Sequence, residues 1–420
     1  MSATRRDFLR ASLGTSALMS IGPAMPALLG RNAWAGTSKD GSGETILVVV
    51  QLAGGNDGLN TVVPYEDDEY ARNRPTLRLP AKEVHKIDAL LGFHPRMQAF
   101  SRLFQQGHLS VVQGVGYPRP SGDHVVAMRD WQSARPHQPS CQTGWLGRVI
   151  DAVAEPNPAS VPGVFVGQIQ QPFTLNAERT VVPSLRSLQQ FSLKAMPGPQ
   201  AASSPDRKPI ETAEISRSGD NPLLDFLQRE WATSRAAGRR IEAVVQNPVA
   251  TGQYPPFQFA RSLRTVAQLI RAEVGIRIYY TELGGNQPGG FDNHANQLGN
   301  HCALLHQLSE SVAAFVDDLK RDKLLDRVLL MTFSEFGRTV KENGRRGTGH
   351  GSAAPMFLAG GKLKGGLIGA HPNLTELENG GQKFHTDFRR VYATVLDRWL
   401  GLDSRIVLGE TFEPVDVLRA

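Results

Sequence analysis

After its first 35 residues, the chain alternates short apolar runs with segments in which apolar residues recur every three or four positions. The apolar runs are rich in β-branched residues and end in Gly or polar clusters, which is typical of strands buried on both faces. We expect strands at 46–52, 109–113, 163–166, 276–280, 328–333 and 356–359. The periodic segments predict helices at 304–319 and 389–400, the second ended by Gly401. This alternation predicts an α/β fold with a mostly parallel central sheet and helices on both faces.

One stretch interrupts the alternation. Residues 194–221 are rich in Pro, Ser, Ala and Gly and contain few large apolar side chains. That composition is typical of a segment that lies outside the core. We therefore predict a flexible insertion here, within a single domain that covers residues 36–420.

The first 35 residues contain the parts of an export signal in the right order. Arg5 and Arg6 precede Phe8, a mildly apolar run covers 11–29, and a small-x-small cleavage site ends at Ala35. Adjacent arginines before an apolar residue indicate the twin-arginine route of bacteria. We predict a twin-arginine signal peptide at 1–35, read by the twin-arginine export machinery. The protein would then be periplasmic or otherwise extracytoplasmic.

Charge, apolar runs and cysteine content exclude several classes of protein. The formal net charge is +6, but residues 1–35 hold four Arg and one Asp, which leaves +3 for the remainder. A nearly balanced body argues against nucleic acid as a partner. No later apolar run reaches the ~18 residues of a membrane span, so we expect no stable membrane span. Two cysteines exclude a Cys-rich metal module, and Cys141 and Cys302 are equally compatible with a disulfide and with two thiols.

Side chains that bind metals flank five of the predicted strands. In an open parallel sheet, ligands bind beyond the carboxyl ends of the strands, so these positions are candidates for one shared site. They are Asp57, Asp123 with His124, Asp292 with His294, Glu335 with Arg338, and His350. Carboxylate and imidazole together suit a divalent cation such as zinc, manganese or calcium. We expect the metal ligands to be Asp57, Asp292, His294, Glu335 and His350.

Each candidate also has a structural interpretation. Asp57 lies in Gly-Gly-Asn-Asp-Gly, a composition typical of a turn, and Asp292 is a possible cap for the next helix. Arg338 is a possible ion-pair partner for Glu335. His350 lies between glycines and has little to pack against, which favours a ligand.

Several segments together resemble an exported bacterial family, the domain of unknown function 1501, which is related to the alkaline phosphatase and sulfatase superfamily. The segments are the twin-arginine start, 54–60, 291–297, 334–339 and 347–351. The resemblance covers nearly all of the chain after the leader. It implies an alkaline phosphatase-like fold and a metal site to which Asp57, Asp292, His294 and His350 contribute.

The sequence departs from the family pattern at two places. Asp123 stands before His124 where many relatives carry Ser, and Gly349 stands before His350 where the superfamily has Asp. Loss of a carboxylate ligand weakens the neutralisation of charge on a phosphoryl or sulfuryl oxygen. Asp123 is a poor replacement for an alkoxide nucleophile, although Ser121 lies two residues away.

We therefore expect an exported, metal-dependent hydrolase of small anionic phosphate or sulfate esters. Asp123 and His124 would complete its site, Glu335 would act as a ligand or a base, and Arg338 would contact the anionic substrate. The alternative is a non-catalytic, metal-containing periplasmic binding or assembly protein on the same fold. The departures at Asp123 and Gly349 favour this alternative.

Overall fold

The computed structural model describes residues 44–153, 162–186, 238–239, 241–244, 246, 250–285, 290–371 and 373–419. The signal peptide predicted at 1–35 and the insertion predicted at 194–221 lie outside the described residues. Both stay predictions.

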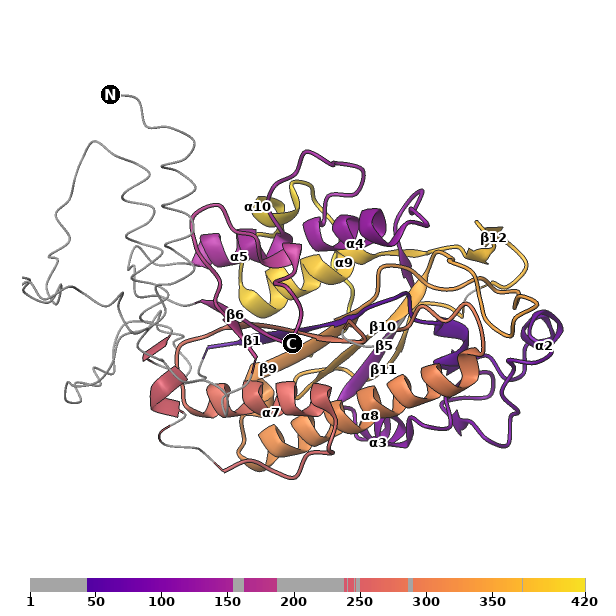
Figure 1. Ribbon diagram of the computed structural model, residues 1–420, viewed down its shortest axis with the longest axis horizontal. Helices are drawn as coiled ribbons and strands as arrows, with labels where there is room; N and C mark the ends of the chain where they lie inside the picture. The colour runs from indigo at the N-terminus through magenta and orange to yellow at the C-terminus, as the bar shows by residue number, and fades with distance from the viewer. Residues whose placement is uncertain are drawn as a thin grey trace, which may run out of the picture.

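A nine-stranded sheet forms the centre of the molecule (Figure 1). Its strands are β1 (Ile46–Leu52), β5 (Leu109–Gly116), β6 (Gly163–Val166), β7 (Ser184–Leu185), β8 (Ile278–Leu283), β9 (Val328–Phe333), β10 (Ala354–Gly360), β11 (Gly366–Ile368) and β14 (Thr386–Asp387). The spatial order is β11-β5-β10-β9-β1-β8-β6-β7, and β14 pairs with β5. All pairings in this sheet are parallel except those of β10, which runs antiparallel to β5 and to β9. The mostly parallel sheet is confirmed.

Helices cover both faces of the sheet, as Figure 1 shows. One layer consists of α3 (Gln98–Gln105), α7 (Gln258–Arg271) and α8 (Gln297–Arg321). The other consists of α4 (His124–Ser133), α5 (Trp145–Val153), α9 (Phe388–Ala393) and α10 (Ser404–Leu408). The helix predicted at 304–319 lies within α8, and the one predicted at 389–400 is α9 followed by a π-helix (Thr394–Leu400). Gly401 ends it, because its φ of 70° is left-handed and costs glycine little.

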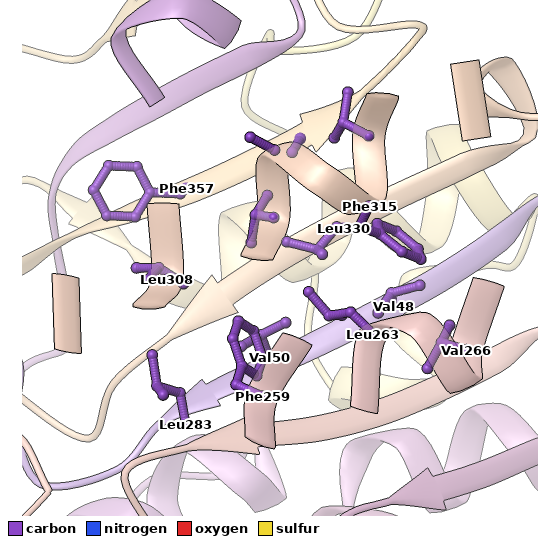
Figure 2. Close-up of a cluster of buried hydrophobic side chains, with 14 of the residues drawn as sticks. Val48, Val50, Phe259, Leu263, Val266, Leu283, Leu308, Phe315, Leu330 and Phe357 are labelled. Atoms are coloured by element: carbon purple, nitrogen blue, oxygen red, sulfur yellow. The ribbon is translucent and has the colours of Figure 1, made fainter. Parts of the chain in front are cut away.

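Successive side chains of β1 pack against the helix layers on opposite faces of the sheet, because side chains of a strand alternate between its faces. Val48 and Val50 belong to the core cluster that holds Leu263 of α7 (Figure 2). Leu47 and Val49 belong to the cluster on the other face. Burial on both faces is why the run 46–52 contains hardly a polar residue.

Smaller elements surround the end of the sheet where β1 finishes. A three-stranded sheet has the order β2 (Val62–Val63), β4 (Gly92–Phe93), β3 (His85–Lys86), and β12 (Leu377–Glu378) pairs with β13 (Gly381–Gln382). The described part also contains the helix α2 (Asp68–Asn73) and three short 3₁₀ turns (58–60, 173–175 and 325–327).

The described part also bears on the expected absence of a membrane span and on the state of the two cysteines. No helix in the described part combines the length and the apolar character that a membrane crossing needs. Cys141 and Cys302, whose pairing the sequence left open, are both free thiols.

Candidate metal centre

Segments far apart in the sequence meet at one edge of the sheet. Residues after β1, β8 and β9 reach this edge because the three strands are parallel neighbours. The antiparallel β10 contributes the residues that precede it instead, because its first residue lies at this edge. The loop after β5 brings the start of α4 to the same place.

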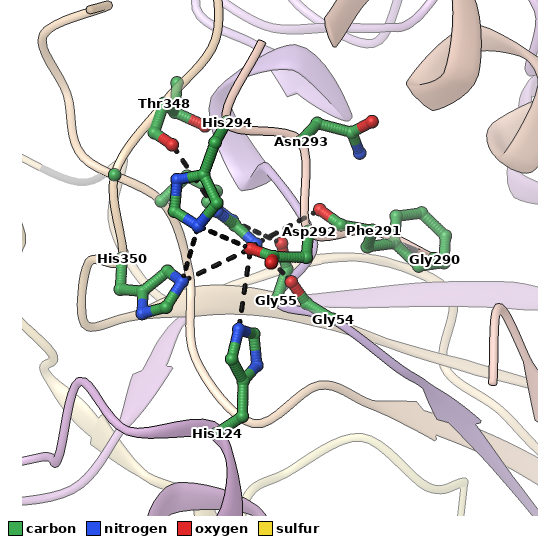
Figure 3. A network of polar contacts seen from close by, with 12 residues as sticks. Gly54, Gly55, His124, Gly290, Phe291, Asp292, Asn293, His294, Thr348 and His350 are labelled. Carbon is green, nitrogen blue, oxygen red and sulfur yellow. Dashed lines mark hydrogen bonds and ion pairs between the residues drawn. The ribbon is translucent and has the colours of Figure 1, made fainter. Parts of the chain in front are cut away.

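Asp292 lies at the centre of the polar network in Figure 3. Its Oδ1 atom is 2.9 Å from Nε2 of His294, 3.2 Å from Nε2 of His350 and 3.5 Å from Nε2 of His124. The Nε2 atoms of His294 and His350 are themselves 2.9 Å apart. Three imidazoles thus point the same kind of nitrogen at one carboxylate oxygen.

The spacing of these atoms fits a metal ion. A tetrahedral ion with bonds of about 2.0–2.1 Å holds its ligand atoms about 3.3 Å apart. The donor atoms of Asp292, His294 and His350 are separated by 2.9–3.2 Å. His124, Asp292 and His350 form a second, overlapping trio whose ligand atoms all lie within 4.8 Å of one another. The two trios share Asp292 and His350, so they describe a single candidate cation site.

The outer nitrogens of two histidines are held by oxygen acceptors. Nδ1 of His350 lies 2.6 Å from the Gly122 carbonyl oxygen, and Nδ1 of His124 lies 3.0 Å from Oε1 of Glu335. A proton on each Nδ1 satisfies these contacts and leaves the lone pair of Nε2 directed at Asp292. Lone pairs and a carboxylate that face one another repel unless positive charge lies between them. This arrangement is compatible with a bound cation.

Burial and neighbouring groups shift the pKa values of the side chains in this cluster. The hydrogen bond to Glu335 raises the pKa of His124, and burial lowers the pKa of His294. Burial would raise the pKa of Asp292, but the hydrogen bond and charge of Arg338, together with the nearby His294 and His124, outweigh this and lower it. Asp292 is consequently an anion at neutral pH and a good ligand.

Glu335 lies behind His124 and is buried. One of its carboxylate oxygens accepts a hydrogen bond from the Gly54 amide at 2.8 Å as well as contacting His124. The other oxygen lies 3.2 Å from the Ser334 hydroxyl oxygen. We expected Glu335 to be a metal ligand. In the structure it is instead the hydrogen-bond partner of His124, which is itself a candidate ligand.

Arg338 is fully buried and anchors the centre from behind. Its guanidinium donates to Asp292 Oδ1 at 2.6 Å, to the Gly55 carbonyl at 2.8 Å and to the Gly54 carbonyl. We expected Arg338 to contact an anionic substrate, but its side chain has 0% exposure and its donors are already used inside the protein. Gly55 accommodates this contact, because a Cβ there would lie 3.2 Å from Arg338 Nε and closer still to Phe336.

Asp57, the ligand expected after β1, is not brought to this cluster. It is buried, and Arg74 donates to its two oxygens at 2.5 and 2.9 Å, with Gln297 donating as well. Burial alone would raise the pKa of Asp57, but the charge and hydrogen bonds of Arg74 lower it below its ordinary value. The carboxylate is therefore paired within the protein.

Asp123 caps α4. Its carboxylate accepts hydrogen bonds from the amides of Val125 and Val126 at 2.9 and 3.0 Å. Such a cap satisfies amides that the first turn of a helix leaves free. We expected Asp123 to take part in catalysis. In the structure it instead caps the helix whose first residue is His124.

Some contributing residues carried no signal that sequence reasoning could use. Arg74 lies in no motif, and the Gly122 group that meets His350 is a backbone carbonyl. Sequence reasoning could have identified Phe336, since it lies between Glu335 and Arg338 in the same motif. Its ring stacks on His350 with centroids 4.6 Å apart.

Comparisons with known proteins bear on the family of the chain. A family model described as "Protein of unknown function (DUF1501)" matches residues 44–411. None of the curated proteins compared with the chain matches it.

Several solved structures are distantly similar. The zinc complex of the C-terminal periplasmic domain of EcEptC from Escherichia coli is 11% identical, with a TM-score of 0.36 over 76% of this chain and 74% of that one. The lipoteichoic acid synthase LtaP from Listeria monocytogenes is 8% identical, with a TM-score of 0.38 over 77% and 67%. The sulfatase PsFucS1 from Pseudoalteromonas sp. is 9% identical, with a TM-score of 0.38 over 89% and 71%. Similarities this distant carry no inference about the substrate or metal of this chain.

The buried pair of Asp57 and Arg74 yields a stability prediction. Arg74→Met should lower the free energy of unfolding by about 3–5 kcal/mol, because it leaves a buried carboxylate without its charged partner. The double variant Arg74→Met with Asp57→Asn should recover part of that loss. Urea unfolding monitored by circular dichroism measures both, and equal stability of the two variants would contradict the pairing.

The same pair predicts how stability depends on pH. The pKa of folded Asp57 is lowered from 3.8, so its ionised form stabilises the fold above about pH 4 and loses this effect as the pH falls further. The stability difference between the native protein and Asp57→Asn should therefore be largest near neutrality and shrink below pH 4. Urea unfolding at several pH values tests this.

Asp317→Asn is the matched control for the pH experiment. Asp317 pairs with Arg102 at the surface, where it is 47% exposed. Exposed ion pairs contribute only about 0–1 kcal/mol, so this variant should differ little from the native protein at any pH. A constant difference between native protein and Asp57→Asn down to pH 2.5 would count against an ionised Asp57.

Proposed function

This chain belongs to the DUF1501 family, and we propose that it is a metal-dependent hydrolase of small phosphate or sulfate esters. The convergence of three imidazole nitrogens on Asp292 Oδ1, at 2.9, 3.2 and 3.5 Å, carries the proposal. A divalent cation is the group for which such an arrangement has a physical reason.

The donor set favours some metals over others. Asp292, His294 and His350 would hold the ion, with His124 as a further ligand. Nitrogen-rich sites of this kind suit zinc best, and manganese, which prefers oxygen ligands, less well. Calcium prefers six to eight oxygen ligands, so three imidazoles do not fit it. When bound, the cation would act as a Lewis acid on an ester oxygen.

Residues of the chain would orient the site. Glu335 holds the proton at Nδ1 of His124, and the Gly122 carbonyl does the same at Nδ1 of His350. Arg338 fixes Asp292 from the buried side. The histidines keep 23–38% of their side chains exposed, so a substrate can reach them from solvent.

Export is a separate part of the proposal. The twin-arginine pattern at 1–35 supports delivery outside the cytoplasm in a folded form. Folding before export would allow the centre to take up its metal in the cytoplasm.

A second candidate function is a non-catalytic metal-containing binding or assembly protein. The observation that favours it is the state of the nearby hydroxyl groups. Ser334 donates to the Leu52 carbonyl at 2.7 Å, and Thr348 donates to Gln297 at 2.8 Å. Both are buried and already hydrogen-bonded, so neither is an evident nucleophile.

Metal content and turnover distinguish the two candidates. The mature protein should bind zinc or manganese stoichiometrically, measured by elemental analysis. It should then cleave an aryl phosphate or an aryl sulfate only when the metal is bound. Stoichiometric metal without turnover would favour the binding protein, and a native protein that binds no divalent metal would contradict both.

His350→Ala should weaken metal binding by more than about 100-fold, because it removes a ligand rather than an outer partner of one. His371→Ala is the matched control, since His371 is also half-buried but pairs with Asp67 outside the cluster. Only the first variant should lose metal and turnover together.

Glu335→Gln tests the role of the outer carboxylate. Glutamine keeps the size of the side chain but removes the charge that supports His124, so metal affinity should fall about 10–100-fold. Competition with a chromophoric chelator measures this. Glu342→Gln is the control, since Glu342 also accepts backbone hydrogen bonds but lies outside the network. Unchanged affinity in Glu335→Gln would contradict the role.

A further inference from the structure

Thr348 joins the two segments that carry His294 and His350. It is fully buried, it stands two residues before His350 in the chain, and Figure 3 shows it beside His294. Its backbone amide donates to the carbonyl of Asn293, the residue before His294, at 3.1 Å. Its backbone carbonyl accepts from Arg338 at 3.4 Å. The backbone of Thr348 thus contacts both the segment of the other histidine and the buried guanidinium behind the centre.

The side chain of Thr348 is held by a buried glutamine. Its hydroxyl donates to Oε1 of Gln297 at 2.8 Å. Gln297 is the first residue of α8 and follows His294 by three positions. Its backbone amide donates to the Arg346 carbonyl at 2.9 Å, and its side-chain amide donates to the carboxylate of Asp57. Gln297 therefore connects the segment of His294 with the loop that leads to the other histidine.

The buried pair of Asp57 and Arg74 contacts this loop by two routes. Through its carboxylate, Asp57 accepts from the glutamine just described. Through its guanidinium, Arg74 donates to the Thr339 carbonyl at 2.9 Å. The Thr339 amide donates to the Gly349 carbonyl at 3.1 Å, and the Gly349 amide donates to the Thr339 hydroxyl at 2.9 Å. The ion pair is thereby connected to both residues that directly precede His350.

These contacts form a chain of buried polar side chains that ends at the metal centre. It runs from Arg74 through Asp57 and Gln297 to Thr348, and none of the four residues is more than 2% exposed. Displacing any member leaves a donor or an acceptor unpaired away from water, so a chain of this kind specifies one geometry. The geometry matters here because the Nε2 atoms of the two adjoining histidines lie 2.9 Å apart.

We propose that Thr348 is a positioning residue of the metal centre. Through its contact with Gln297 it fixes the spacing of the ligand atoms of His294 and His350. Asp57 then contributes to the centre through this chain of contacts, without being a ligand. The inference rests on the proposed function where metal affinity is the readout, and on the metal-free protein where the positions of the rings are the readout.

Zinc affinity is the first test. Thr348→Val keeps the shape of the side chain and removes its hydroxyl, so Gln297 loses its donor. The zinc affinity of the mature protein, measured by competition with a chromophoric chelator, should fall at least about 10-fold, as it does when an outer partner of a metal ligand is lost. Thr348→Ser keeps the hydroxyl and should bind zinc nearly as tightly as the native protein. If the native protein binds zinc and Thr348→Val binds it equally well, the inference is wrong.

Thr394→Val is the matched control, because it removes a buried hydroxyl elsewhere in the molecule. Thr394 is 0% exposed at the start of the π-helix that follows α9, and its hydroxyl donates to the Arg390 carbonyl at 2.9 Å. Both valine variants should unfold at a lower temperature than the native protein, but only Thr348→Val should lose zinc affinity. An equal loss of affinity in both would trace the effect to general stability and overturn the inference.

A measurement without metal separates this inference from the proposed function. In metal-free protein labelled with ¹⁵N-histidine, NMR records the ring nitrogens of His294 and His350, which alanine variants assign. Their signals should shift in Thr348→Val and keep their positions in Thr394→Val. If they do so although the native protein binds no zinc, the proposed function fails and the positioning role stands. Ring signals that are the same in Thr348→Val and in the native protein would overturn the inference, even beside a lower zinc affinity.

Discussion

The buried guanidinium of Arg338 is the interaction on which the candidate centre depends. It follows β9, and it donates to carbonyls of the segment after β1 and to Asp292 in the segment after β8. One cation thereby joins the ends of three neighbouring strands. A buried charge of this kind is tolerated only when its donors are satisfied, and here a carboxylate and several carbonyl oxygens do so. The same contacts explain why the side chain is unavailable to a substrate.

With Asp292 fixed from behind, the histidines can be oriented from outside. His124 and His350 come from separate loops, and each is held through Nδ1 by an oxygen acceptor. This leaves Nε2 as the inward atom in both cases. If the centre binds a metal, its ligands are oriented in advance, because the outer contacts at Nδ1 set the ring orientations. Such preorganisation is what outer partners of metal ligands supply.

Two aspartates that look alike in the sequence have opposite fates. Asp57 and Asp292 both follow a buried strand next to glycines, and both have a lowered pKa. Asp57 is enclosed with Arg74, whereas Asp292 is partly exposed and meets imidazole nitrogens as well as Arg338. A carboxylate fully paired with a buried guanidinium stabilises the fold. One that keeps a face toward imidazoles and solvent is available to a ligand.

The sequence by itself determined the six longer strands of the sheet, most of the long helix α8 and the edge of the sheet at which polar residues gather. Apolar runs and their periodicity report burial directly, and parallel neighbours must end at the same edge. Most of the cluster, including Asp292, His294 and His350, followed from this rule. Only the tertiary structure decided what each of these polar side chains contacts. Asp57 pairs with Arg74, Arg338 is buried against Asp292, and Asp123 caps α4. The tertiary structure also decided the reversed direction of β10, which a loop of ordinary residues between β9 and β10 does not reveal. The physical reason is that a polar side chain is satisfied by whichever group folding brings within about 3 Å, and the local pattern holds no record of that distant partner.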